Sequence, residues 1–311
     1  MLQTVEEVAG KIRTGQTLAL AGDEEALRGL PLGNWIAGTI PYFMDQEGGV
    51  CSRDRIFVTP LSDCVTGIEI RSHSLSTLPD ILGDAPENGF TLLILPAGSA
   101  VHAAYARNAS SYPGIFVKPV IGWVSGVHVT EIGTRLPQVV NGVTGAWSSE
   151  DAVAMHASLP AGKLAELDTI NVFKPGPGSA ICFPTTGFEA LSCHVDGEPT
   201  NFANYLKRSG SDTRLPLTAD YNGAVINVSI QSVDQGTGVV KFYAPVFEGV
   251  EYRLAAPVDD YVAAFESLVD SGEPPMFSCN CILNYLYSHL EGRKTSSATG
   301  PMTFGFGTRE K

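Results

Sequence analysis

The stretch Phe90-Thr91-Leu92-Leu93-Ile94-Leu95 is the strongest signal for a buried strand in this chain. Small residues follow it in the loop Pro96-Ala97-Gly98-Ser99, and residues 100–109 then have a composition typical of a helix. A buried strand, a short loop and a helix in this order form an element that combines sheet and helix. The stretch therefore predicts an α/β element at residues 90–109.

Shorter elements surround this one. Val5, Val8 and Ile12 are spaced as on one face of a helix. A turn cluster at residues 175–178, Pro-Gly-Pro-Gly, marks a boundary, and closely spaced strands with a few helices follow it. We therefore expect an α+β protein of two connected α/β halves, residues 1–175 and 176–311, with mixed or largely antiparallel sheets flanked by helices.

Composition excludes several classes of protein. The 311 residues are 44% hydrophobic, which is enough for a large core and argues against disorder. Lys and Arg number 20 against 33 Asp and Glu, so the net charge of -13 disfavours nucleic acid and anionic membranes as partners. No signal peptide is recognisable, and no apolar run approaches the ~20 residues that span a bilayer. The six cysteines are then expected to be reduced thiols, and the expected compartment is the cytoplasm.

The two cysteines of the stretch Cys279-Asn280-Cys281 are expected at the start of a final helix over residues 281–290, with Ser278 as the cap of that helix. A thiol at a helix N-terminus has a lowered pKa, so Cys279 could be a nucleophile, a redox thiol or a ligand contact. Packing of two small side chains in a buried junction is the alternative interpretation.

Other catalytic and cofactor motifs are weak or absent. Ser99 and His102 lack the Gly-x-Ser-x-Gly pattern of a hydrolase, so Ser99 is predicted to be a helix N-cap. No zinc-site spacing occurs, and no phosphate-binding or dinucleotide-binding fingerprint is found. We therefore predict no metal and no cofactor.

Five blocks in the second half occur in the order and spacing of a known family. They are Val195-Asp196-Gly197-Glu198-Pro199 leading into 202–206, Leu215-Pro216-Leu217, residues 246–254, the cysteine block 277–280, and Gly300-Pro301-Met302-Thr303-Phe304-Gly305. Over roughly residues 185–305 the chain resembles the FIST sensory family, whereas the first half is similar only in patches such as Gly38-Thr39. The resemblance implies a prokaryotic module that binds a small molecule and is often fused to an output domain. Because we expect no residues left over here for such a domain, a stand-alone sensor would have to signal through a separate protein. Because some members are linked to haem, His102 and His128 are the nearest candidates for an axial ligand.

The first hypothesis is a stand-alone, non-catalytic small-molecule sensor with a pocket between its halves. Aromatic side chains would supply apolar contact and polar ones would orient the ligand. The predicted lining is Trp35, Thr39, Tyr42, His102, Trp123, Cys279 and Asn280.

Two alternatives remain open from the sequence. One is a cysteine-dependent enzyme with Cys279 as nucleophile and a histidine as base. The other is an interaction protein without a ligand. A signalling partner and a homodimer are both compatible with the first hypothesis.

Overall fold

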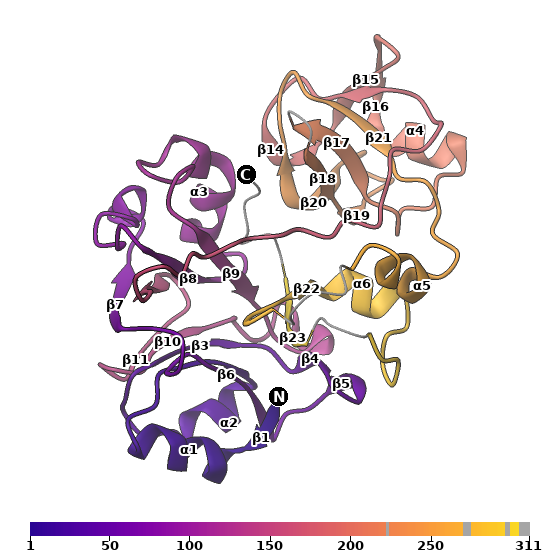
Figure 1. Cartoon of the computed structure of the whole chain (residues 1–311). Coiled ribbons are helices and arrows are strands. Elements are labelled where there is room, and N and C mark those ends of the chain that lie inside the picture. The colour runs from indigo at the N-terminus through magenta and orange to yellow at the C-terminus, as the bar shows by residue number, and fades with distance from the viewer. Residues whose placement is uncertain (222–223, 270–274, 296–298, 305–311) are drawn as a thin grey trace. The chain divides into compact units, whose positions relative to one another are not determined.

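The structure is a computed structural model, and it describes residues 1–221, 224–269, 275–295 and 299–304 (Figure 1). The chain is an α+β protein, as expected. It divides into two compact units, unit 1 (Met1–Asp168 with Asp270–Lys311) and unit 2 (Thr169–Val269). The predicted halves, 1–175 and 176–311, differ from this division because the last part of the chain returns to unit 1.

The first sheet of unit 1 has six strands in the order β1-β6-β2-β3-β10-β11. Only β2 and β3 pair in parallel within it. The strands are β1 (Leu2–Thr4), β6 (Arg55–Pro60), β2 (Leu18–Gly22), β3 (Trp35–Thr39), β10 (Val139–Asn141) and β11 (Ala146–Ser148).

Two helices cover one face of this first sheet, α1 (Val5–Arg13) and α2 (Glu24–Arg28). Thr4 begins α1 with a capping box: its hydroxyl accepts from the amide of Glu7, whose carboxylate accepts from the Thr4 amide. Val8 and Ile12 of α1 then pack on Leu18 and Leu20 of β2. The helical spacing seen in the sequence is thus the buried face of α1.

The second sheet of unit 1 has the order β7-β12-β8-β9, with only β8 and β9 parallel. Its strands are β7 (Gly67–His73), β12 (Ala152–Ser158), β8 (Gly89–Pro96) and β9 (Val120–Ser125). The outer face of this second sheet packs against α3 (Ala100–Asn108) and the short helix η1 (Leu78–Asp80), and η2 (Ala109–Ser111) follows α3. Every residue of β8 is buried, which confirms the strand predicted at residues 90–95.

The two sheets lie face to face, so unit 1 has helices outside and two sheets inside (Figure 1). At Gly38 of β3 the first sheet packs tightly against side chains of the second sheet. A Cβ at Gly38 would lie 2.7 Å from Cγ2 of Ile94 and 2.9 Å from Nε1 of Trp123. Glycine is required here for contact between the sheets rather than for an unusual backbone angle.

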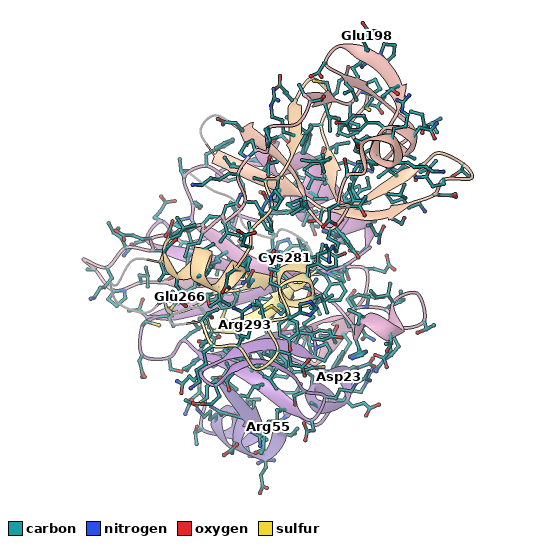
Figure 2. All side chains as sticks on the ribbon, turned by 90° about the vertical axis from the view of Figure 1, so that its right-hand side faces the viewer. Asp23, Arg55, Glu198, Glu266, Cys281 and Arg293 are labelled. Carbon is teal, nitrogen blue, oxygen red and sulfur yellow. The ribbon has the colours of Figure 1, made fainter. Side chains whose placement is uncertain are left out.

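A third sheet of unit 1, in the order β22-β23-β4-β5, joins the end of the chain to its beginning. Its strands are β22 (Asn280–Cys281), β23 (Gly300–Thr303), β4 (Tyr42–Asp45) and β5 (Gly48–Cys51), and α6 (Ile282–Tyr287) follows β22. Beyond β23, the amide of Phe304 donates to the carbonyl of Val124 at 3.0 Å. This C-terminal segment, in which Figure 2 labels Cys281 and Arg293, therefore completes unit 1.

Unit 2 is built from antiparallel strands around an aromatic core. Phe183 lies at the centre, 5.2–5.6 Å between ring centroids from Phe202, Phe242 and Tyr252. One sheet has the order β16-β15-β13-β21-β17-β18 and the other β14-β20-β19. The elements are β13 (Ile181–Cys182), β14 (Gly187–Ala190), β15 (Ser192–Val195), β16 (Glu198–Asn201), α4 (Phe202–Ser209), β17 (Leu217–Tyr221), β18 (Ala224–Val228), β19 (Ile230–Val233), β20 (Val240–Val246), β21 (Glu251–Leu254) and α5 (Tyr261–Glu266).

Replacement of Gly38 by alanine tests the contact between the two sheets of unit 1. Because the added methyl group must displace Ile94 and Trp123, we expect a loss of about 1–3 kcal/mol in the free energy of unfolding, measured by urea denaturation. Gly67→Ala is the matched control, since no atom lies within 4 Å of a Cβ at that position of β7. Equal stability of the two variants would contradict close packing of the sheets at Gly38.

Candidate functional site

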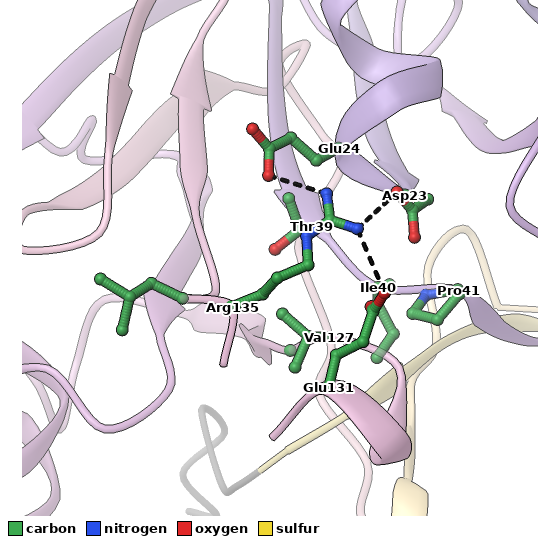
Figure 3. A pocket seen from close by; sticks show the side chains of 10 residues that line it. Asp23, Glu24, Thr39, Ile40, Pro41, Val127, Glu131 and Arg135 are labelled. Atoms are coloured by element: carbon green, nitrogen blue, oxygen red, sulfur yellow. Dashed lines mark hydrogen bonds and ion pairs between the residues drawn. The ribbon is translucent and has the colours of Figure 1, made fainter. Parts of the chain in front are cut away.

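The carboxyl ends of β2, β3 and β9 meet at one edge of unit 1. The amide of Ile40 donates to the carbonyl of Gly22 at 2.9 Å, and the amide of Gly126 donates to the carbonyl of Thr39 at 2.7 Å. Sites in sheets with parallel strands commonly lie at such carboxyl ends. A small hollow opens here (Figure 3), and it is lined by Asp23, Glu24, Thr39, Ile40, Pro41, Gly126, Val127, Glu131, Arg135 and Leu136.

Arg135 is the central charged side chain of the hollow. Its Nη2 lies 3.0 Å from Oε2 of Glu24, and its Nη1 lies 3.5 Å from Oε1 of Glu131 and 3.7 Å from Oδ1 of Asp23 (Figure 3). The side chain of Arg135 is 28% exposed. It connects α2 with the short helix η3 (Val129–Glu131).

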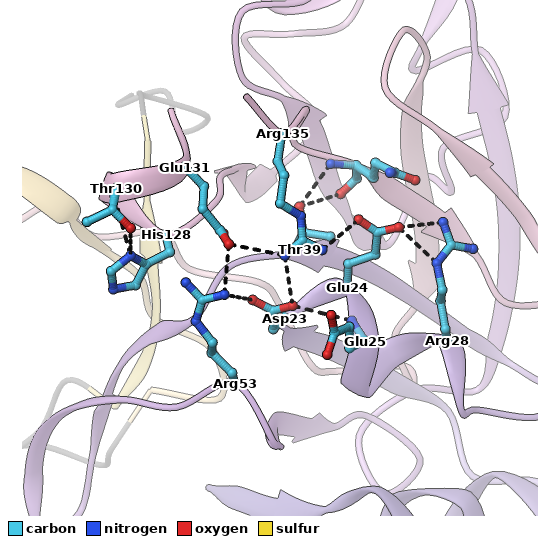
Figure 4. Close-up of polar contacts among 11 residues, drawn as sticks. Asp23, Glu24, Glu25, Arg28, Thr39, Arg53, His128, Thr130, Glu131 and Arg135 are labelled. Carbon is cyan, nitrogen blue, oxygen red and sulfur yellow. Dashed lines mark hydrogen bonds and ion pairs between the residues drawn. The ribbon is translucent and has the colours of Figure 1, made fainter. Parts of the chain in front are cut away.

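Arg53 extends these contacts into a network (Figure 4). Its Nη1 lies 2.9 Å from Oε1 of Glu131 and 3.9 Å from Oδ2 of Asp23. Asp23 is almost fully buried and caps α2, since its Oδ1 accepts from the amide of Glu25. We refer to Asp23, Glu24, Arg53, Glu131 and Arg135 as the charged network.

The contacts of the charged network favour the ionised forms of Glu24, Glu131 and Arg135. The hydrogen bond from Arg53 lowers the pKa of Glu131, and the hydrogen bond to Glu24 raises the pKa of Arg135. Burial opposes ionisation of Glu24, but hydrogen bonds from Arg28 and Arg135 prevail and lower its pKa. Charge-assisted hydrogen bonds of this kind are stronger than hydrogen bonds between neutral groups.

Two predicted site residues lie at or beside the hollow. Thr39 lines it, and its hydroxyl accepts from the amide of Gln138 at 2.9 Å and donates to the carbonyl of the same residue at 3.3 Å. Tyr42 lies next to η3: its hydroxyl accepts from the amide of Val129 at 3.2 Å and its ring stacks on His128. Tyr42 thus holds the start of the segment that carries Glu131.

The two predicted tryptophans are packing residues in the structure. Trp35 lies in the core between the first sheet and its helices, and its Nε1 donates to the carbonyl of Pro31. Trp123 lies between the two sheets, is 1% exposed and stacks on Phe277 with ring centroids 5.6 Å apart. Large aromatic side chains pack equally well in a core and in the wall of a pocket, so the sequence alone does not distinguish these two positions.

His102 lies on α3, on the outer face of the second sheet. Its Nδ1 accepts from the amide of Gly98 at 3.3 Å, and burial lowers its pKa to about 4. Ser99 caps this helix, because its hydroxyl accepts from the amide of His102. The prediction of Ser99 as an N-cap is confirmed.

Cys279 does not lie at a helix N-terminus, which corrects the sequence prediction. It precedes β22, and α6 begins after Cys281, which is its N-cap; Ser278 instead donates to the carbonyl of Thr299. The Cys279 thiol donates to the carbonyl of Gly122 at 3.3 Å, and burial raises its pKa to about 12 rather than lowering it. Asn280 accepts from the side chain of Asn284 at 3.0 Å.

The sequence analysis missed the charged network. Its members come from three separate segments, the start of α2, the loop between β5 and β6, and η3 with the loop after it, and charged residues in such places usually face solvent. One signal was present: Asp23 and Glu24 directly follow the buried strand β2. Carboxylates at the carboxyl end of a buried strand are a recognisable position for a site.

These features define an α+β protein with a charged hollow at the carboxyl ends of parallel strands. The chain belongs to the family of unknown function DUF6976, whose model matches residues 3–306. No curated protein and no solved structure matches it. Within the described ranges, no helix is long and apolar enough to cross a bilayer, and no three His, Cys, Asp or Glu residues are grouped to hold a metal ion.

The thiol of Cys279 is expected to react slowly in the folded protein. With a pKa of about 12, fewer than about one molecule in 10,000 carries the thiolate at pH 7.5. Iodoacetamide treatment followed by peptide mass spectrometry should leave Cys279 unlabelled until urea is added. Rapid labelling at Cys279 alone would instead favour the cysteine-dependent enzyme.

Acid is expected to destabilise the protein through buried histidines. Burial lowers the pKa values of His102 and of His156 on β12 from 6.5 to about 4. The unfolded chain therefore binds more protons at these two histidines, so the stability that they contribute is fully present above about pH 6.5 and is lost as the pH falls toward 4. The free energies of unfolding at pH 7 and pH 5, measured by urea denaturation, should differ by on the order of 1–2 kcal/mol for each histidine.

The variant His102→Gln provides the control for this pH dependence. Burial also lowers the pKa values of His73 and of the Met1 amino group, and these groups stay in the variant. Because His102→Gln removes one group that titrates in this range, its loss of stability between pH 7 and pH 5 should be smaller than that of the unmodified protein. The carboxylates with lowered pKa values titrate below this window. A midpoint that does not change between pH 7 and pH 5 would contradict the assignment.

Proposed function

We propose that this protein is a small-molecule sensor whose ligand binds at the hollow beside Arg135. The observation that carries the proposal is the position of Arg135, which is partly exposed in the hollow and bonded to Glu24 on one side and Glu131 on the other. A polar ligand can replace one of these partners without unfolding any element. Ion-pair exchange of this kind couples occupancy to a local rearrangement.

The segment that would respond is the one from His128 to Leu136. It contains η3 and both ends of the Glu131–Arg135 contact. Ile132 and Leu136 in the same segment are 51% and 65% exposed, which is high for large apolar side chains. A shift of η3 would move these side chains, and a separate signalling protein could detect the change.

The raised pKa values of the buried thiols favour a sensor over a cysteine-dependent enzyme. A catalytic cysteine needs a thiolate, and burial raises the pKa values of Cys279 and Cys281. All six cysteines are free, which is the state expected in the cytoplasm, the compartment we assign to the sensor. The resemblance of residues 185–305 to FIST sensory proteins rests on the sequence blocks alone, and it is what suggests sensing as the role of this site.

Native mass spectrometry after incubation with a metabolite extract tests the proposal. The unmodified chain should carry an added small-molecule mass. Arg135→Gln should lose it or bind about 10- to 100-fold more weakly, because one charge-assisted hydrogen bond is worth about 1.5–3 kcal/mol. Arg71→Gln is the control, since Arg71 of β7 also forms ion pairs with two carboxylates, Glu69 on the same strand and Asp84 beyond it.

Circular dichroism separates a loss of binding from a loss of folding. Arg135→Gln should keep the spectrum of the unmodified chain, because the network lies at the edge of the sheets and outside their cores. Retention of the added mass in folded Arg135→Gln would overturn the assignment of the hollow. If Arg71→Gln also loses the added mass, the loss in Arg135→Gln would reflect the change in net charge rather than a contact in the hollow.

A further inference from the structure

Within the described part of the chain, one edge of the second sheet of unit 1 is unpaired. This edge is β7, which pairs with β12 on one side and with no described strand on the other (Figure 1). The opposite edge, β9, is covered: the amide of Val124 donates to the hydroxyl of Thr303, and its carbonyl accepts from the amide of Phe304. The sheet is therefore closed at β9 by the end of the chain and open at β7.

β7 is long and regular for an exposed edge strand. It has seven residues, more than any other edge strand among the described residues, and all seven keep one register with β12. Four of the seven are exposed, and none is proline or lysine. Natural sheets usually protect such an edge with a bulge, a proline, a lysine or a covering segment, because its free N–H and C=O groups can pair with another chain. Since the described residues provide none of these, β7 is suited to pair with a strand of a partner.

The sequence of β7 is complementary to itself when two copies run antiparallel. With Ile70 placed opposite Ile70 of a second copy, Glu69 of each chain lies opposite Arg71 of the other. Opposite charges that face each other directly stabilise a strand pair, and so does an apolar pair. A two-fold axis at Ile70 relates the copies, so the pair of Glu69 with Arg71 occurs twice.

The two charges also select the register of this pair. Moving the axis by one residue puts Glu69 opposite Glu69 or Arg71 opposite Arg71, and like charges that face each other directly destabilise the pair. An axis between two residues would place side chains of opposite faces side by side, which the pleat of the strands does not allow. Ile70 is therefore the favoured centre.

Both charged side chains are accessible for such contacts. The side chains of Glu69 and Arg71 are 44% and 52% exposed, and they form an ion pair with each other. Nε of Arg71 also lies 3.3 Å from Oδ2 of Asp84. A guanidinium group has five N–H donors, so Arg71 can keep Asp84 and also bond to Glu69 of a second copy. Pairing across the axis thus adds to an exposed contact and breaks no buried one.

We propose that two copies of this chain associate through β7, as an antiparallel strand pair centred on Ile70. The two four-stranded sheets then join into one continuous sheet. Seven residues from each copy bury little surface, and interfaces below about 1,200 Å² belong to weak or transient complexes. The dimer therefore forms in a concentration-dependent way. No residue that lines the hollow belongs to β7, so association and ligand binding at the hollow are tested separately.

Sedimentation velocity of the full chain at increasing concentrations tests the association. The unmodified chain should shift from monomer to dimer. Glu69→Arg and Arg71→Glu should each weaken the dimer about 10-fold or more, because both symmetry-related pairs change from attraction to repulsion. Arg214→Glu is the matched control for Arg71→Glu: it breaks the ion pair with Asp212 in unit 2, which has the same spacing along the chain. This control should associate like the unmodified chain.

Mixing the two single variants separates strand pairing from a loss of folding. Both positions are positive in Glu69→Arg and both are negative in Arg71→Glu, so a mixed pair has opposite charges at each contact. The mixture should form a dimer as readily as the unmodified chain, although neither variant does so alone. The double variant Glu69→Arg/Arg71→Glu exchanges the two charges, keeps the net charge of the chain and should also dimerise.

Hydrogen–deuterium exchange locates the contact on the strand. Residues 67–73 should exchange more slowly at concentrations where the dimer prevails, because N–H groups at the free edge become bonded. A chain that stays monomeric, a dimer that neither single variant weakens, or exchange at residues 67–73 that does not depend on concentration would each overturn the proposal. The exchange of the unmodified chain remains decisive if a variant does not fold.

Discussion

The close approach of the two sheets at Gly38 is the constraint on which unit 1 depends. Because no side chain intervenes there, Ile94 and Trp123 of the second sheet rest directly on β3 of the first. The next residue, Thr39, then lies close enough for its carbonyl to accept from the amide of Gly126. The carboxyl ends of strands from both sheets are thereby brought to one edge, where the hollow and the charged network lie.

Local patterns in the sequence predicted much of this architecture. The fully buried run at residues 90–95 is a central strand, and the caps at Thr4 and Ser99 begin helices, because these features depend on neighbours a few residues away. The division into units depends instead on the pairing of β23 with β4, which are more than 250 residues apart. Such a contact leaves no local periodicity, so the boundary placed at 175 could not account for the return of the chain to unit 1.

The candidate site was predicted only in part, for a similar reason. Thr39 lines the hollow and Tyr42 supports it, and both belong to the glycine-broken aromatic stretch that the sequence analysis singled out. Trp35 and Trp123 were predicted to line the pocket because they are aromatic, as Tyr42 is, but their side chains are buried in the interior. Asp23, Arg53 and Arg135 are brought together by strand order and loop paths, which the spacing of charges along the chain does not encode.

The chain order of the units has a consequence for biosynthesis. Unit 2 is an uninterrupted run, Thr169–Val269, whereas unit 1 lacks β22 and β23 until the last part of the chain is made. During translation, domains generally fold as units once their residues are available. The second unit can therefore become compact on the ribosome while the β4 edge of the first is still unpaired, and that edge is closed only after β23 has been made. A truncated product would consequently expose that edge and be a target for proteolysis or for misassembly with another chain.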